Sequence, residues 1–181
     1  MNPKLWGPTY WYIFHILSYS YDEKYKNNYI NMFKYISFSI PCITCKNHFK
    51  NLLIRYPPHL NINDRDSMIK WLVDLHNFVN KRLGKKVITV SNAKNIYYNN
   101  KKLIINHQKI IKFIEIIKKS ISGNSIAINN VSNILINFCS IVPCDKCREK
   151  LLIFVNNPNL IRTQGLIKFS NSIINIIKGC K

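Results

Sequence analysis

Isoleucine and leucine recur at three- to four-residue spacing through most of this chain, and that spacing constrains the fold more than any other feature. Residues at this spacing share one face of a helix, which can be buried against other helices. Proline and glycine, which interrupt helices, number only 7 and 5 among 181 residues. Hydrophobic residues make up 47% of the chain, enough to build a core. The sequence therefore predicts an all-α fold, as one ordinary domain or two small ones.

The chain is strongly basic, with 27 Lys+Arg against 8 Asp+Glu and a formal net charge of +19. Such an excess is compatible with binding to nucleic acid or to another anionic partner. The basic residues are spread evenly over both halves and form no basic stripe, and only 5 of them are arginine. No nucleic-acid-binding module is recognisable. A basic nucleic-acid-binding protein is therefore kept only as an alternative.

Four helices are expected in the first half of the chain. Pro8 is typical of a first helical turn, Pro41 ends the second helix, and Gly84 terminates the fourth. Asn63 or Asp64 can cap the fourth helix at its start. The expected ranges are about 3–21, 24–39, 42–56 and 63–83. Short helices with short connections predict an antiparallel bundle, whose core is a common site for cofactors.

Cys42 and Cys45 directly follow Pro41, so two thiols lie one turn apart at the start of the third helix. There the unpaired amide groups and the positive end of the helix dipole favour a thiolate, which suits a redox disulfide. Half of a zinc site or a structural disulfide would use the same spacing. The spacing alone does not choose among the three.

Polar side chains interrupt the apolar faces of two helices. His15 shares one face of the first helix with Trp11, and on its own it is more typical of a hydrogen-bonded core histidine. His76 and Asn80 lie in the stripe of the fourth helix that also holds Leu83. Because buried polar groups are costly without a hydrogen-bond partner, this stripe needs another side chain or a polar ligand against it.

In their order along the chain, Trp-Gly-Pro-Thr-Tyr-Trp at 6–11, His15, the pair Cys42 and Cys45, and the segment 76–85 resemble the Erv/ALR flavin-linked sulfhydryl oxidases. The resemblance covers about 3–100 and is greatest to members from large DNA viruses. It implies a four-helix bundle that binds FAD, oxidises protein dithiols to disulfides and passes the electrons to oxygen, giving hydrogen peroxide.

The resemblance also implies roles for individual residues. Cys42 would accept the attack of the substrate thiolate, and Cys45 would transfer the electrons to the flavin. Rings would stack on the cofactor, amides would bind its polar edges and lysines would neutralise its pyrophosphate. The implied FAD-binding residues are Gly7, Trp11, His15, His76, Asn77, Asn80, Lys81, Leu83, Lys85 and Tyr97.

Two features of the family are missing from this chain. Val73 stands where many cellular relatives have a cysteine that ties the fourth helix to a downstream cysteine. The N-terminal cysteine pair that shuttles electrons in some relatives is also absent. The fold must then be held by packing and FAD, and a substrate thiol or another cysteine pair of this chain must reach the active disulfide directly.

The second half repeats the pattern of the first. Residues 131–151 match 29–49 at a constant offset of 102, which places Cys144 on Cys42 and Cys147 on Cys45. Residues 166–179 echo 68–81, and 108–121 would echo the first helix. These matches predict an internal duplication, with a catalytic bundle at 1–100 and a second helical bundle at 101–181.

The second copy has lost the side chains that would contact a flavin, since Trp11, His15 and His76 are replaced by Phe113, Ile117 and Ile174. The second bundle is therefore expected to bind no flavin. We expect it to pack on the first as a second subunit does in dimeric family members, an intramolecular pseudo-dimer that the baculovirus enzymes resemble. A homodimer is the alternative.

The other four cysteines are open to several interpretations. Cys144 and Cys147 could be a relic, a structural disulfide or a shuttle pair, and the first two are favoured because symmetry would place this pair far from the first. Cys139 and Cys180 have no assignable partner and are expected to be free thiols. A zinc site built from both cysteine pairs is a further alternative, but the favoured interpretation includes no metal.

The start of the chain has no apparent signal peptide, and no run of about 18 apolar residues could span a bilayer. Thiol-containing proteins and molecular oxygen are the expected partners. The composition and the viral resemblance together place the protein in the host cytoplasm at the viral assembly site, in the virion, or in both. There it would support disulfide formation in virion proteins.

Overall fold

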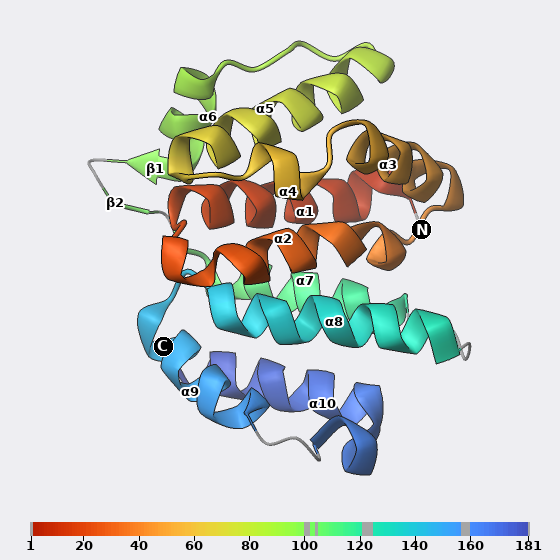
Figure 1. Ribbon diagram of the computed structural model, residues 1–181, viewed down its shortest axis with the longest axis vertical. Coiled ribbons are helices and arrows are strands. Elements are labelled where there is room, and N and C mark those ends of the chain that lie inside the picture. Colours follow the sequence, from red (N-terminus) through yellow and green to blue (C-terminus); the bar gives the residue numbers. More distant parts are fainter. Residues whose placement is uncertain (1, 100–101, 104, 121–124, 157–159, 181) are drawn as a thin grey trace.

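The computed structural model describes residues 2–99, 102–103, 105–120, 125–156 and 160–180, and it confirms the all-α fold (Figure 1). The first half contains α1 (Pro3–Tyr19), η1 (Glu23–Tyr25), α2 (Lys26–Tyr35), η2 (Ile36–Ser39), α3 (Ile43–Arg55), α4 (Pro58–Asn61), α5 (Arg65–Arg82) and α6 (Val90–Tyr97). The second contains α7 (His107–Lys119), α8 (Ser125–Ile141), α9 (Asp145–Val155) and α10 (Leu160–Lys178). A short antiparallel ladder, β1 (Tyr98–Asn99) with β2 (Lys102–Leu103), joins the two halves.

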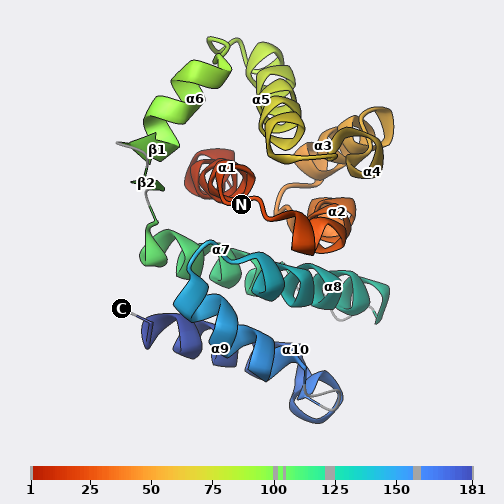
Figure 2. The ribbon, with the colours of Figure 1, turned by 60° about the vertical axis from the view of Figure 1, so that its left-hand side comes forward.

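Helix α1 lies in the middle of the molecule (Figure 2). Helices α2, α3, α5 and α6 surround it on one side, and α7 and α8 lie on the other. Helix α7 packs against α1, and α8 packs along α2. Helices α9 and α10 form the layer farthest from α5 (Figure 1). The first helix is therefore the element around which both halves are arranged.

The local sequence explains where α1 begins. The Asn2 side chain accepts a hydrogen bond from the backbone N–H of Lys4 (2.9 Å), and Pro3 occupies the first helical position. The expectation that Pro8 lies in the first turn is therefore wrong, because the helix begins earlier and continues through Pro8.

The predicted fourth helix is confirmed as α5. The Asp64 side chain accepts from the backbone N–H of Ser67 (2.8 Å), and the Ser67 hydroxyl accepts from that of Asp64 (2.9 Å). This capping box satisfies two amide groups at the helix start. Gly84 follows the helix with φ 64°, a left-handed conformation that glycine adopts without strain. Between α3 and α5 lies α4, a short helix that was not predicted.

The hydrophobic core is continuous across the middle of the chain. The rings of Tyr10 and Phe113 meet edge to face with centroids 5.0 Å apart, and Phe113 also contacts Phe138 at 5.2 Å. On the other side of α1, Phe14 contacts Phe33 at 5.1 Å. Residues of both halves thus belong to one buried cluster.

None of the helices in the described ranges combines the length and the apolar character needed to cross a membrane.

Candidate functional site

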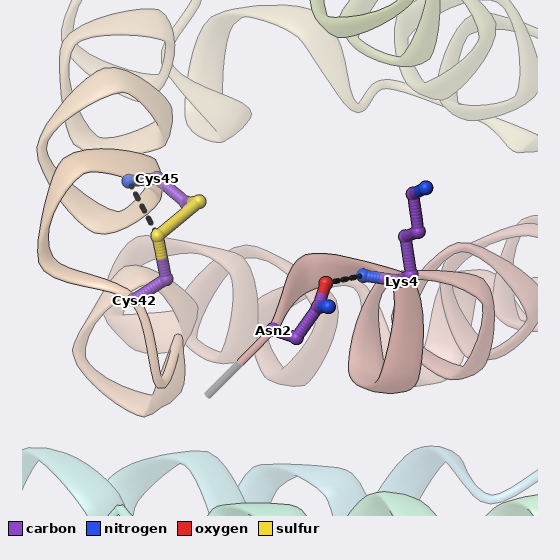
Figure 3. The surroundings of a disulfide bond; sticks show 4 residues. All are labelled: Asn2, Lys4, Cys42 and Cys45. Atoms are coloured by element: carbon purple, nitrogen blue, oxygen red, sulfur yellow. Dashed lines mark hydrogen bonds between the residues drawn. A yellow bond between two sulfur atoms is a disulfide. The ribbon is translucent and has the colours of Figure 1, made fainter.

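Cys42 and Cys45 form a disulfide at the start of α3 (Figure 3). Cys42 is the N-cap residue, and its Sγ accepts a hydrogen bond from the backbone N–H of Cys45 (3.3 Å). The two Cα atoms are 5.2 Å apart. A sulfur at this position faces the positive end of the helix dipole, which lowers the free energy of a thiolate. In this structure the two sulfurs are bonded to each other, so they are not available to a zinc site shared with the second cysteine pair.

Four aromatic or imidazole rings from three helices meet in the first half of the chain, and we call them the ring cluster: Trp11 and His15 of α1, His76 of α5 and Tyr97 of α6. The Trp11 and His76 rings stack with centroids 3.9 Å apart and an interplanar angle of 7°. His15 Nε2 lies 3.0 Å from His76 Nδ1, and Tyr97 stacks on His15 at 4.7 Å. The structure thus brings together four of the predicted site residues.

Phe49 connects the disulfide with the ring cluster. It follows Cys45 by one turn on the same face of α3, and its ring packs against Trp11 with centroids 6.2 Å apart. It also lies 6.0 Å from the ring of Phe14 in the core. The face of α3 that carries Cys45 is therefore the face that meets the rings.

Burial keeps the two histidines of the cluster neutral. It lowers the pKa of His15 to about 3, with a smaller contribution from His76. Burial and, secondarily, the positive charge of Lys85 lower the pKa of His76 to about 4. His15 Nδ1 is buried and has no hydrogen-bond partner within the described residues. Burying such an atom without a partner is costly, so it retains hydrogen-bonding capacity for a ligand.

The other predicted site residues differ in what they can contact. Asn80 is buried on α5, whereas Lys81 and Lys85 are exposed at its end. Leu83 caps the helix and is 55% exposed, so its placement on a buried stripe is wrong. A Cβ added to Gly7 would meet nothing within 4 Å, so the chain's own atoms do not require glycine there.

Asn77 holds the segment that follows α5. Its side-chain amide donates to the carbonyl of Ile88 (2.8 Å), and its Oδ1 accepts from the backbone N–H of Ile88 (2.8 Å). Both ends of the amide are engaged by the chain itself. Asn77 therefore positions the loop between α5 and α6.

A cavity of about 700 Å³ lies beside the ring cluster, between α5 and α6. Tyr19, Val73, Asn77, Lys94 and Tyr98 are among its lining residues, but neither cysteine and no ring of the cluster is. Sequence reasoning missed Tyr19, Lys94 and Tyr98. Tyr19 could have been found, because it extends the four-residue spacing of Trp11 and His15 along α1.

Comparisons with known proteins agree with this geometry. The family model described as "Erv1 / Alr family" matches residues 8–99, about half of the chain. The FAD-linked sulfhydryl oxidase of African swine fever virus (isolate Pig/Kenya/KEN-50/1950) is 33% identical over 122 residues, which cover 65% of this chain and 93% of that protein. The probable FAD-linked sulfhydryl oxidase R368 of Acanthamoeba polyphaga mimivirus is 31% identical over 98 residues, covering 51% and 68%.

A cellular relative also matches. The FAD-linked sulfhydryl oxidase ERV1 of Arabidopsis thaliana is 33% identical over 85 residues, which cover 45% of this chain and 44% of that protein. No solved structure matches the chain. The matched residues 8–99 contain the disulfide at α3 and all four residues of the ring cluster.

Proposed function

This chain belongs to the Erv1/Alr family, and we propose that it is an FAD-linked sulfhydryl oxidase whose redox disulfide is Cys42–Cys45. The overall reaction is 2 R–SH + O₂ → R–S–S–R + H₂O₂, with thiol-containing proteins as substrates. One observation carries the proposal: Phe49 packs the cysteine-bearing face of α3 directly against the ring cluster. A disulfide on a helix face that packs through Phe49 against stacked rings is suited to two-electron exchange with a flat cofactor.

Cys42 is the residue that receives the substrate. A substrate thiolate attacks Cys42 Sγ, the Cys42–Cys45 bond breaks, and its electron pair remains on Cys45 as a thiolate. A second substrate thiolate then attacks the mixed disulfide at the substrate sulfur and releases Cys42. The substrate gains a disulfide, and Cys42 and Cys45 are left reduced with two electrons. The N-terminus of α3 stabilises the thiolates formed in these steps.

The ring cluster and the end of α5 would hold FAD. Trp11, His76 and Tyr97 offer flat faces, and His15 Nδ1 offers a hydrogen-bonding atom. Lys81, Lys85 and Asn80 can bind the polar parts of the cofactor, with Gly7 and Leu83 completing the set, and Asn77 would contribute by positioning the loop after α5. Bound FAD supplies the two-electron chemistry that regenerates the disulfide with oxygen as the final acceptor.

The test uses the purified full-length protein. We expect flavin absorbance, oxygen consumption with a dithiol, and peroxide as product. Cys45→Ser should abolish this turnover, whereas Cys139→Ala, at a buried thiol away from the disulfide, should retain it. A Cys45→Ser protein with full oxygen-dependent thiol oxidation would contradict the assignment. A flavin-free protein that retains DNA in a salt-sensitive manner would instead favour the nucleic-acid alternative.

We further propose that residues 101–181 form a second bundle that arose by duplication of 1–100. Helices α7, α8, α9 and α10 follow in the order of α1, α2, α3 and α5. Cys144 is the N-cap of α9, and its Sγ accepts from the backbone N–H of Cys147 at 3.3 Å, as Cys42 does from Cys45. Phe113, Ile117 and Ile174, at the positions of the lost ring residues, are all buried. We therefore expect this bundle to bind no flavin.

The contact between the halves supports a pseudo-dimer within one chain. Helix α7 packs on its counterpart α1, and α8 packs on its counterpart α2. In an isologous dimer, elements near the two-fold axis meet their own copies in this way. We therefore expect a monomer in light scattering. A tight dimer that forms through the catalytic bundle would contradict the proposal.

The viral relatives support a site of action during virus assembly. We propose that the protein works in the host cytoplasm at assembly sites or in the virion, and that it oxidises virion proteins. Immunolabelling of infected cells together with mass spectrometry of purified virions would test this. A protein confined to another compartment and absent from virions would contradict it.

A further inference from the structure

A second cluster of sulfur and imidazole groups lies in the second half, away from the disulfide. His107 Nε2 and the sulfurs of Cys144 and Cys147 all lie within 4.8 Å of one another. His107 Nε2 lies 3.6 Å from Cys147 Sγ. His107 begins α7, while Cys144 and Cys147 begin α9. Residues separated by about forty positions thus converge at one point.

Cys180 adds a fourth group. It follows the end of α10 and is buried, with its Sγ donating to the carbonyl of Ile176 (3.1 Å). The thiols of Cys144 and Cys180 both interact with the buried thiol of Cys147. Two thiols and one imidazole therefore lie close enough to share one metal ion, and the thiol of Cys180 lies next to that of Cys147.

This donor set matches a known type of metal site. Structural zinc is bound tetrahedrally by four cysteine or histidine ligands, often with two cysteines in a Cys-x₂-Cys spacing. With Zn–S of about 2.3 Å and Zn–N of about 2.1 Å, tetrahedral sulfur and nitrogen ligands lie about 3.6 Å apart. The observed contact between His107 and Cys147 has that separation. We propose that His107, Cys144, Cys147 and Cys180 bind one structural Zn²⁺ ion, a site beyond the proposed oxidase activity.

Binding requires the thiols to lose their protons. Zn²⁺ with three thiolates and a neutral imidazole carries a net charge of −1, and three protons are released to solvent. Arg148 and Lys146 flank Cys147 in the sequence, and the chain as a whole is strongly basic, so a site with negative charge is electrostatically favoured. To complete the four ligands, Cys180 Sγ would exchange its hydrogen bond to the Ile176 carbonyl for a bond to the metal.

The zinc ion would hold the helices of the second half together, as we propose that FAD does in the first half. It would join the start of α7, the start of α9 and the end of α10, and these helices lack the rings that hold a cofactor in the first half. At the matching offset, the position of His107 is taken in α1 by Leu5, which is 63% exposed. Only the second half therefore has an imidazole beside its cysteine pair at that position.

The experiment measures zinc by elemental analysis in the purified, FAD-loaded full chain under mild reduction. We expect about one zinc per chain. Cys144→Ser, Cys147→Ser and His107→Ala should each weaken zinc binding by more than the roughly 10–100-fold that loss of an outer-shell partner costs. Cys180→Ser should do the same. A Cys42→Ser/Cys45→Ser variant must keep its zinc, because reduced thiols of the redox pair could otherwise account for the metal.

Two controls keep the result interpretable. Cys139→Ala removes another buried thiol of α8 and should retain zinc, and His59→Ala removes an exposed histidine and should also retain it. Should the ligand variants fail to fold, Co²⁺ added to the zinc-stripped wild type should give the absorption bands of tetrahedral thiolate ligation. The proposal is overturned by wild type that binds neither zinc nor cobalt, by zinc that persists in the Cys144→Ser and Cys147→Ser variants, or by a Cys144–Cys147 disulfide in the native protein. None of these results depends on oxidase activity.

Discussion

The starts of α3 and α9 carry the same cysteine motif in the same local geometry, yet their surroundings differ. In each, the first cysteine is the N-cap and its sulfur accepts from the backbone N–H of the second at 3.3 Å. On α3, Phe49 packs against Trp11 of the ring cluster, whereas the pair of α9 meets His107 and Cys180. Local sequence thus determines the geometry of the pair, and side chains from distant segments determine its chemistry.

The same contrast runs through the helices that support each pair. In the first half, the positions of Trp11, His15 and His76 hold rings and polar nitrogens that are partly unsatisfied. In the second half, the matching positions hold apolar side chains, which are buried in the core and need no hydrogen-bond partner. One half keeps unmet hydrogen-bonding capacity for a ligand, and the other uses the same positions for core stability.

The largest expected effect concerns the two cysteine pairs. Cys42→Ser should lower kcat/KM for a dithiol by roughly 10³-fold or more, because the residue that forms the mixed disulfide is lost. Oxygen consumption under saturating oxygen measures this. Cys139→Ala is the matched thiol control and should remain near wild type. Near-normal turnover in Cys42→Ser, combined with loss in Cys147→Ser, would reverse the roles of the two pairs.

Substitutions at the matching positions 11 and 113 should separate binding from stability. Phe113→Ala should lower the free energy of unfolding by about 3–5 kcal/mol, because Phe113 is fully buried between Tyr10 and Phe138. It should leave the flavin content per folded chain unchanged. Trp11→Ala should instead weaken flavin binding by about tenfold, since one stacking face is removed. Urea titration and flavin fluorescence measure the two effects, and equal loss of flavin in both variants would contradict the contrast.

The neutral histidines of the ring cluster predict a pH dependence of stability. The pKa values of His15 and His76 are lowered in the folded state, so between about pH 6.5 and pH 4 the unfolded chain binds more protons. Stability should therefore be complete above pH 6.5 and fall as the pH drops, by about 1.4 kcal/mol per pH unit for each histidine.

Urea titrations at pH 7 and pH 5 measure this difference, and His76→Gln should reduce it. His59→Ala, at an exposed histidine, is the control and should show the wild-type difference. Stability in His76→Gln that falls as steeply as in the wild type would show that other groups cause the effect.

The smallest expected effect concerns the loop after α5. Asn77→Ala should lower stability by about 1–2 kcal/mol, because two hydrogen bonds to Ile88 are lost. Asn77→Asp keeps the acceptor for the Ile88 N–H and should recover part of this loss. If Asn77→Ala abolished flavin binding without changing stability, direct contact with the cofactor would be its main role.

Much of the site was predictable because it depends on local physics. Cap residues such as Asp64 and the left-handed Gly84 mark helix ends through their own hydrogen bonds and backbone freedom. The four-residue spacing of Trp11 and His15 places them on one face of α1 wherever that helix packs. The pair Cys42 and Cys45 could be recognised from spacing and helix position, and the structure confirms both its place and its bond.

Other features were decided only by packing between distant segments. Asn77 faces the backbone of Ile88 rather than standing free, and Leu83 is exposed, because the path of the loop after α5 is not encoded in the helical spacing. His107 meets Cys147 across forty residues, and Cys180 reaches the same point from the end of α10. Sequence alone determined the helices and the local geometry of each cysteine pair. Tertiary structure decided which groups surround each pair, since those contacts depend on how non-neighbouring helices pack.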